Sequence, residues 1–125
     1  MKNIKALGSK VTRFQGFDTF KAPGGVVNVR CVTDEVTANC PVTNQPDWYT
    51  VEICYTPNRV CVESKTLKLY LQSFRNRGLF CEAFANTIAT DLYNALSPET
   101  ISVTVTQKPR GGVSIIATAR LNRTR

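Results

Sequence analysis

The chain has 125 residues, a length that suits one domain with a modest hydrophobic core. Hydrophobic residues make up 42% and charged residues 20%, which is typical of a globular protein, and no apolar run approaches the roughly 20 residues of a membrane span. The N-terminal stretch is basic without an apolar segment, so we do not expect it to be a secretory signal. We expect one cytoplasmic domain over residues 1–125, and the net charge of +7 favours a polyanionic partner, either a phosphorylated cofactor or a nucleic acid.

The first third of the chain predicts two strands and a long loop. Residues 1–22 are expected to be irregular, because Gly8, Gly16 and Pro23 interrupt them. Residues 26–33 (VVNVRCVT) are rich in β-branched side chains and predict a strand. Residues 34–47 carry prolines, asparagines and aspartates, which indicate a loop, and residues 48–55 (WYTVEICY) predict the second strand.

A helical period begins at Glu63. One helix is expected to run from there to Gly78, and a second one to end at Pro98. Apolar residues recur with helical spacing in both, at Leu67, Tyr70, Leu71 and Phe74 in the first and at Phe84, Ile88, Leu92, Ala95 and Leu96 in the second.

The C-terminal part predicts a hairpin, with strands at 101–107 and 113–121 joined by the turn KPRGG. The element order β-β-α-α-β-β indicates an α+β domain with an antiparallel sheet. Two helices cover only one face of four strands, so we expect apolar groups such as Val103, Val105 and Ile115 or Ile116 to need a partner. Closure of a barrel by several subunits is one solution.

The cysteines and the absence of histidine limit the chemistry. Five cysteines in a chain without a signal peptide favour reduced thiols, and their spacing contains no CxxC pair, so no metal site is expected. The chain has no histidine, which excludes Ser-His and Cys-His catalytic pairs. A nucleophilic cysteine would therefore have to pass its proton to another group.

Three segments hold candidate functional residues, each with an ordinary structural alternative. In ANCPVTNQPD, Cys40 and Asp47 lie at the two ends of a proline-stiffened loop, although Cys40 could equally be a small buried residue. In ESKTLKLY, charges gather at a helix start that could bind an anion, or Glu63 could simply cap the helix. The turn beside Arg110 could hold phosphate or be an ordinary hairpin turn.

Taken together, the segments CPVTNQPD, VESKTLKLYLQSFRNRG, FCE and PRGGVSI resemble the QueF nitrile reductase family over residues 40–116. The resemblance implies the tunnelling fold, a four-stranded antiparallel sheet with two helices on one face. It also implies a homo-oligomeric barrel of stacked rings with active sites between subunits. The activity implied is the NADPH-dependent reduction of the nitrile of 7-cyano-7-deazaguanine to 7-aminomethyl-7-deazaguanine, in queuosine biosynthesis.

The resemblance also implies roles for individual residues. Cys40 matches the nucleophile that forms a covalent thioimide, and Asp47 matches the proton donor. The positions that match the substrate site are Val62, Glu63, Ser64, Cys81 and Glu82. The positions that match the NADPH site are Ser64, Lys65, Arg110 and Gly111.

Three positions depart from the family pattern. Thr66 stands where a smaller residue is usual, and Asn44 replaces a glycine, a change that Asn tolerates because it adopts left-handed backbone. Cys81 stands where the family carries a histidine beside the glutamate. A thiol cannot act as the cationic donor that a protonated histidine provides. Capture of the nitrile by Cys40 is therefore expected to survive while the hydride steps are slowed.

Two other functions are compatible with the sequence. One is a QueF-like amidinotransferase, or a reductase, that acts on the cyano base within tRNA or DNA; the positive charge favours this reading, and the NADPH motif opposes it. The other is a non-catalytic tunnelling-fold protein that binds a purine or nucleic acid, which retention of Cys40 and Asp47 opposes. GTP cyclohydrolase shares the fold but needs a zinc-binding histidine, which this chain lacks.

Overall fold

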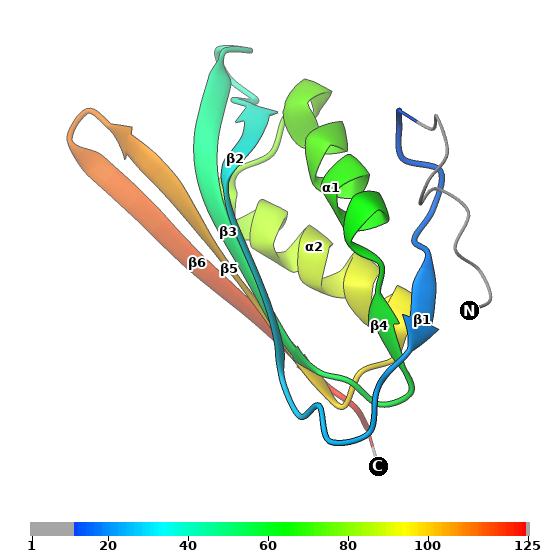
Figure 1. Ribbon diagram of the computed structural model, residues 1–125. Helices are drawn as coiled ribbons and strands as arrows, with labels where there is room; N and C mark the ends of the chain where they lie inside the picture. Colours follow the sequence, from blue (N-terminus) through cyan, green and yellow to red (C-terminus); the bar gives the residue numbers. More distant parts are fainter. Residues whose placement is uncertain (1–11, 125) are drawn as a thin grey trace.

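The structure is a computed structural model that describes residues 12–124. Its centre is an antiparallel sheet of order β2-β3-β5-β6, formed by β2 (Val29–Asn39), β3 (Pro46–Thr56), β5 (Thr100–Arg110) and β6 (Val113–Asn122). Helices α1 (Ser64–Gln72) and α2 (Cys81–Leu96) cover one face of this sheet (Figure 1). The predicted α+β class and the β-β-α-α-β-β order of the main elements are confirmed.

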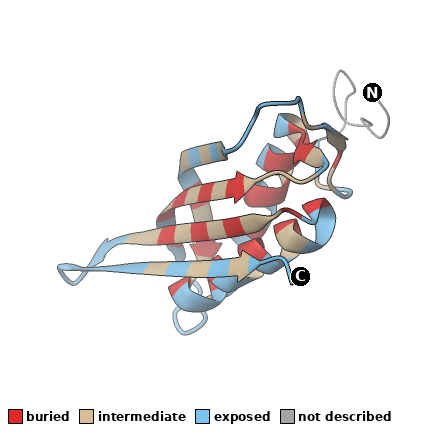
Figure 2. Cartoon of the chain, turned by 90° about the horizontal axis from the view of Figure 1, so that it is seen from below, coloured by how far each residue is buried: buried red, intermediate tan, exposed pale blue. Residues whose placement is uncertain are grey.

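The core lies between the sheet and the helices. Buried residues alternate with more exposed ones along the strands (Figure 2), so that one face of β3 and β5 is apolar. Val103 and Val105 belong to this face and are fully buried beneath the helices. The prediction that they need a partner is therefore wrong, because the alternation of β5 turns its valines toward α2 and its threonines away. Ile115 and Ile116 remain exposed, as expected.

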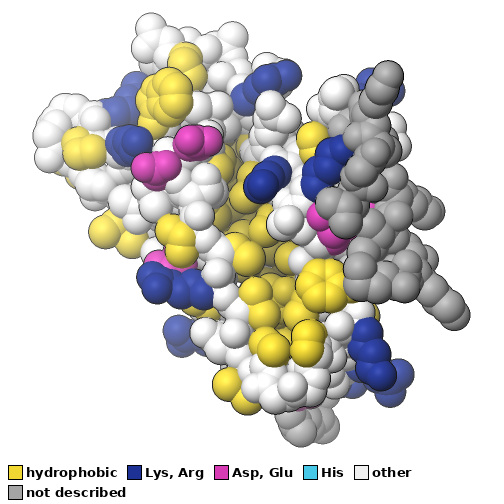
Figure 3. Space-filling view, viewed as in Figure 1, with side chains coloured by type: hydrophobic (Ala, Val, Ile, Leu, Met, Phe, Trp, Pro, Cys, Tyr) yellow, Lys and Arg dark blue, Asp and Glu magenta, His cyan; other side chains and the backbone are white. Residues whose placement is uncertain are grey.

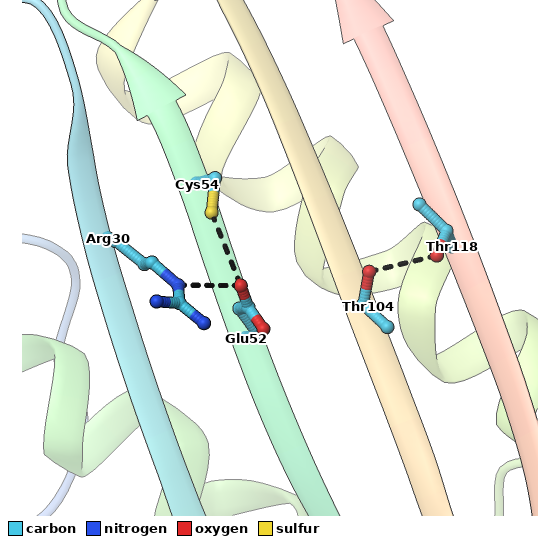
Figure 4. Close-up of polar contacts among 5 residues, drawn as sticks. All are labelled: Arg30, Glu52, Cys54, Thr104 and Thr118. Carbon is cyan, nitrogen blue, oxygen red and sulfur yellow. Dashed lines mark hydrogen bonds and ion pairs between the residues drawn. The ribbon is translucent and has the colours of Figure 1, made fainter.

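The opposite face of the sheet carries polar pairs, among which a few apolar side chains such as Val32 and Ile116 are exposed. The hydroxyls of Thr104 and Thr118 lie 2.8 Å apart across β5 and β6, and Arg30 Nε donates to Glu52 Oε2 at 2.6 Å across β2 and β3 (Figure 4). Cross-strand pairs of this kind stabilise a sheet surface that faces water.

The second strand extends further than the sequence predicts. Residues 34–39 continue β2, and the predicted loop 34–47 shrinks to residues 40–45. A register shift between Thr33 and Val36 accommodates the polar residues that indicated a loop, and beyond it Val36 and Ala38 again face the core.

A second small sheet was not predicted. Strand β1 (Thr19–Lys21) pairs antiparallel with β4 (Val60–Val62), and both strands are too short to give a periodic signal. The first helix ends at Gln72 and continues as the 3₁₀ turn η1 (Ser73–Asn76), before the glycine that was expected to stop it. The β1–β4 pair fixes the chain at the entry to α1.

Candidate active site

The loop at Cys40 is closed by its own backbone. Cys40 N donates to the Gln45 carbonyl at 2.8 Å, and Asn44 N donates to the Cys40 carbonyl at 2.9 Å. Asn44 adopts a left-handed conformation (φ 58°), as its place in the sequence predicted. The turn therefore holds Cys40 directly at the end of β2, with only 8% of the residue exposed.

A neighbouring segment supports this loop from the side of the helices. Asn39 N donates to the Arg77 carbonyl at 2.8 Å, and Leu79 N donates to the Asn39 carbonyl at 3.2 Å. Gly78, between them, approaches so closely that a Cβ atom there would lie 3.4 Å from Pro41 Cα. The connection from η1 to α2 thus fixes the backbone on either side of the thiol.

Hydrogen-bond donors surround the Cys40 sulfur. The backbone amide and the hydroxyl of Thr43, the Val42 amide and the Arg110 guanidinium together lower the pKa of Cys40 to about 7, against a weaker opposing effect of burial. Donors stabilise the thiolate rather than the thiol. About half of the Cys40 side chains are consequently ionised at neutral pH, which is the state in which a thiol is nucleophilic.

Arg110 also contacts Asp47. Its Nη1 lies 3.0 Å from Asp47 Oδ1 and 3.3 Å from Oδ2, and the Asp47 side chain is only 6% exposed. The pKa of Arg110 is raised by its hydrogen bond to Cys40 and by the charge of Asp47. One guanidinium therefore joins the predicted nucleophile to the predicted proton donor.

Strand pairing explains why these residues meet. Tyr49 of β3 lies opposite Gln107 of β5, so the last residue of β5 reaches the start of β3, where Asp47 stands. Gly111 and Gly112 then turn the chain with φ values of 59° and 80°, a conformation that favours glycine. The sequence left open whether this turn binds phosphate, and it did not reveal the strand register that brings Arg110 to Asp47.

Cys81 and Glu82 begin α2 and face different surroundings. Cys81 is 1% exposed, and its Sγ donates to the carbonyls of Val105 at 3.4 Å and Ile115 at 3.6 Å. Burial is the main influence that raises the pKa of Cys81. Glu82 is exposed in the first turn of the same helix. Within the described chain, Cys81 is thus part of the core, and Glu82 is accessible to a ligand.

The remaining predicted residues lie at the start of α1. Both carboxylate oxygens of the buried Glu63 accept from backbone amides, Oε1 from Thr66 and Oε2 from Lys65, each at 2.8 Å. Val62 N donates to Tyr55 Oη at 3.0 Å. Glu63 is therefore the N-cap of α1, while the next residue, Ser64, is exposed.

A groove of about 730 Å³ separates α1 from β2 and β3. Apolar side chains line its floor, visible as a cleft in the space-filling view (Figure 3), and Ser64, Lys68 and Arg75 contribute polar and basic groups. The apolar floor consists of Val36, Val51, Ile53, Leu67 and Leu71. Lys65 does not line this groove.

Apart from Cys81 and Glu82 at the start of α2, the predicted site residues fall into two groups within one chain. Cys40, Asp47, Arg110 and Gly111 lie where β2 connects to β3 and β5 to β6, at the same end of the sheet. The segment 62–65 lies at the N-terminal end of α1, beside β4 and away from the connection between β2 and β3 (Figure 1). A nine-residue helix is about 14 Å long. The chain therefore does not bring its two groups together by itself.

Tyr49 is a further residue at this site that the sequence reasoning missed. Its side chain is fully buried, and its hydroxyl is a buried side-chain polar atom without a hydrogen-bond partner among the described residues. Burial, followed by the charges of Asp47, Cys81 and Cys40, raises its pKa to about 12. The available signal was its spacing, two residues after Asp47 on the same face of β3.

Among residues 12–124, no group of three or more His, Cys, Asp or Glu side chains is placed to hold a metal ion. No helix in this part of the chain has the length and apolar character needed to cross a membrane.

Comparisons with known proteins give a consistent picture. The family model described as "QueF-like protein" matches residues 46–125. NADPH-dependent 7-cyano-7-deazaguanine reductases are similar to the chain, at 42% identity over 125 residues in Streptococcus thermophilus (92% of this chain, 76% of the relative). The reductase of Anaeromyxobacter sp. strain K is 46% identical over 98 residues, which cover 78% of this chain and 80% of the relative. That of Frankia casuarinae is 39% identical over 109 residues, which cover 87% of each chain.

A solved structure shares the fold. The apo form of the archaeosine synthase QueF-Like superposes with a TM-score of 0.74 over 84% of this chain and 100% of its own, at 24% sequence identity. Identity at this level supports the fold and no more.

Proposed function

This chain belongs to the QueF-like protein family, and from this premise we propose that it is an NADPH-dependent reductase of 7-cyano-7-deazaguanine with Cys40 as its covalent nucleophile. The observation that carries the proposal is the cluster of Cys40, Asp47 and Arg110. It supplies an ionisable sulfur, a carboxylate for proton transfer and a cation that touches both.

This geometry supports nucleophilic addition to the nitrile as the first step. The Cys40 sulfur attacks the nitrile carbon, one C–N bonding pair moves to nitrogen, and the nitrogen gains a proton, which yields a neutral thioimide. The proton that leaves the thiol is the one the nitrogen gains, so the addition is balanced. Asp47 is placed to carry this proton, and its contact with Arg110 fixes the carboxylate beside the sulfur.

The groove along α1 fits a phosphorylated dinucleotide. Its apolar floor suits flat rings, while Ser64, Lys68 and Arg75 supply donors for phosphate. NADPH, when bound, supplies a hydride, and reduction of a nitrile to an amine requires two hydrides in succession. Lys65 keeps its role as a proposed phosphate contact at the helix start. Arg110 is also retained, although in the single chain it is engaged by Asp47.

Assembly of several subunits would complete the site. The two groups of proposed residues lie at opposite ends of α1, so the deazapurine contacts proposed for Val62, Glu63 and Ser64 need a second copy to reach Cys40. Exposed apolar residues on β6, such as Ile116, and the unpaired edges of β2 and β6 offer contact surface. Light scattering at micromolar concentration should therefore give a mass of several subunits, and a monomer would contradict a shared site.

The experiment that tests the proposed function first measures adduct formation at the thiol and then adds the cofactor. The purified protein is incubated with 7-cyano-7-deazaguanine without NADPH, and its intact mass is measured. Wild type should gain the mass of one substrate per chain, and addition of NADPH should release it as the aminomethyl base. Release by ammonia instead of NADPH would identify an amidinotransferase.

Matched variants locate the adduct. Cys40→Ala should form none, whereas Cys54→Ala should behave as wild type, because Cys54 lies on the polar face of the sheet beside Glu52. An adduct that persists in Cys40→Ala would move the nucleophile to another cysteine.

A further inference from the structure

Tyr49 carries a hydroxyl that the folded chain leaves unsatisfied. The oxygen exposes less than 1 Å² to solvent and has no hydrogen-bond partner among residues 12–124, although buried polar groups in native proteins nearly always have one. The other buried tyrosine of the same strand shows the usual arrangement, since Tyr55 Oη accepts from Val62 N at 3.0 Å. An unsatisfied hydroxyl therefore needs a partner that the free chain does not provide.

Packing fixes the direction of the Tyr49 side chain. Its ring meets that of Phe84 of α2 edge to face, with centroids 4.9 Å apart and planes at 84°. It projects from the same face of β3 as Asp47, two residues away. The ionisable groups acting on it are Asp47, Cys81 and Cys40, with Arg110 in opposition. The hydroxyl thus lies beside the reactive cluster rather than in a remote part of the core.

We propose that the Tyr49 hydroxyl is a further catalytic residue, which donates a hydrogen bond to the nitrile nitrogen while the Cys40 sulfur adds to the nitrile carbon. This inference rests on the proposed function. A nitrile is linear and slender, and the proposal places its nitrogen against this hydroxyl. Negative charge develops on that nitrogen during addition, and a fixed donor aimed at developing charge accelerates such a step.

Tyr49 and Asp47 have different roles because a phenol and a carboxylate differ in their chemistry. A phenol whose pKa is about 12 stays protonated throughout the neutral range and remains a donor. The net proton transfer is still from the Cys40 thiol to the nitrogen, carried by Asp47, so Tyr49 ends the step unchanged. The hydroxyl supplies what Cys81 cannot, because the Cys81 thiol is already directed at two backbone carbonyls.

The test compares Tyr49→Phe with Tyr55→Phe. Each variant removes one buried hydroxyl from β3 and keeps the ring. Tyr49→Phe should slow adduct formation with 7-cyano-7-deazaguanine by about 100-fold, which is typical for the loss of one such donor. Its melting temperature should not fall, because no protein hydrogen bond is lost. Tyr55→Phe should melt earlier and, with 7-cyano-7-deazaguanine at saturating concentration, form the adduct at the wild-type rate.

A second measurement separates action on the substrate from action on the thiol. The rate at which iodoacetamide alkylates Cys40 is followed against pH in wild type and in Tyr49→Phe. The two profiles should coincide, because the proposed hydrogen bond forms only with the nitrile. A shifted profile would mean that Tyr49 acts on Cys40 and would overturn the proposal, as would an unchanged adduct rate in Tyr49→Phe. Absence of an adduct in wild type would instead refute the proposed function.

Discussion

Cys40 and Cys81 are almost equally hidden from solvent, and their surroundings differ in the direction of the hydrogen bonds. Amides, a hydroxyl and a guanidinium donate to the Cys40 sulfur and lower the pKa of Cys40 to about 7. The Cys81 sulfur donates to two carbonyls, and burial raises the pKa of Cys81. A low exposed fraction therefore does not by itself determine whether a thiol is reactive, because donors around the sulfur lower the pKa of Cys40 whereas burial raises that of Cys81.

The secondary structure explains this difference. Cys40 follows the end of β2, where the amides of a tight turn are not used by the sheet and can point at the sulfur. Cys81 begins α2, a position that ordinarily lowers the pKa of a thiol. Its side chain is nevertheless packed against the sheet, next to the carbonyls of β5 and β6, and the loss of solvation outweighs the helix start.

The largest expected effect is in the rates of labelling. At pH 7, iodoacetamide should alkylate Cys40 at least about 100-fold faster than Cys81, because about half of Cys40 is thiolate while Cys81 must wait for local opening of the core. Peptide mapping by mass spectrometry after timed quenching measures both rates in one sample. In denaturant the two cysteines should react alike. Equal alkylation rates of Cys40 and Cys81 in the folded protein would contradict the difference in reactivity inferred for the two thiols.

A smaller effect is expected at Arg110. Its guanidinium stabilises the Cys40 thiolate, so removal of the charge should raise the pKa of Cys40 toward the value of about 8.5 for a free thiol. In Arg110→Gln the alkylation profile should move to higher pH, and the rate at pH 7 should fall roughly threefold. Arg123→Gln is the matched control, because Arg123 pairs with Glu99, away from the cluster.

This measurement also distinguishes two roles of Arg110. It needs neither substrate nor NADPH, so a shift can be attributed to the thiol itself. If the profile of Arg110→Gln were identical to that of wild type, Arg110 would serve only the cofactor, as the sequence resemblance implied.

The sequence predicted the architecture better than the details of the site. Helical spacing from Leu67 to Phe74 and alternation over 101–107 are strong local signals, and both elements exist, although α1 ends at Gln72 and Phe74 lies in the 3₁₀ turn that follows it. The extension of β2 through residues 34–39 was missed because a bulge places charged residues inside a strand. Local composition cannot reveal that irregularity.

The same limit applies to the site. Cys40 and Asp47 are close in sequence, so their proximity was predictable from the loop. Arg110 reaches them only through the register of β3 with β5, and Tyr49 stands out only when its hydroxyl is seen to have no partner. Long-range register and hydrogen-bond satisfaction are properties of the folded chain, which one sequence without relatives does not display.

The smallest expected effect on the alkylation of Cys40 is that of replacing Cys81. Cys81→Ala removes a buried sulfur and should lower the free energy of unfolding by about 1 kcal/mol, measured by urea denaturation, while the alkylation profile of Cys40 stays unchanged. The change leaves every donor to the Cys40 sulfur in place, so a coincident profile would show that the two thiols are independent.

Cys81→His provides the sharper version of this test, because the family resemblance places a histidine at that position. If Cys81 faces the substrate, the histidine variant should be stable and should reduce the nitrile faster than wild type. The burial of Cys81 predicts the opposite, since an imidazole is larger than a thiol and must displace the carbonyl contacts to Val105 and Ile115. Overpacking of a core typically costs about 1–3 kcal/mol. We therefore expect Cys81→His to unfold at lower urea concentration without a gain in turnover. A stable and faster variant would show instead that the start of α2 opens toward the substrate.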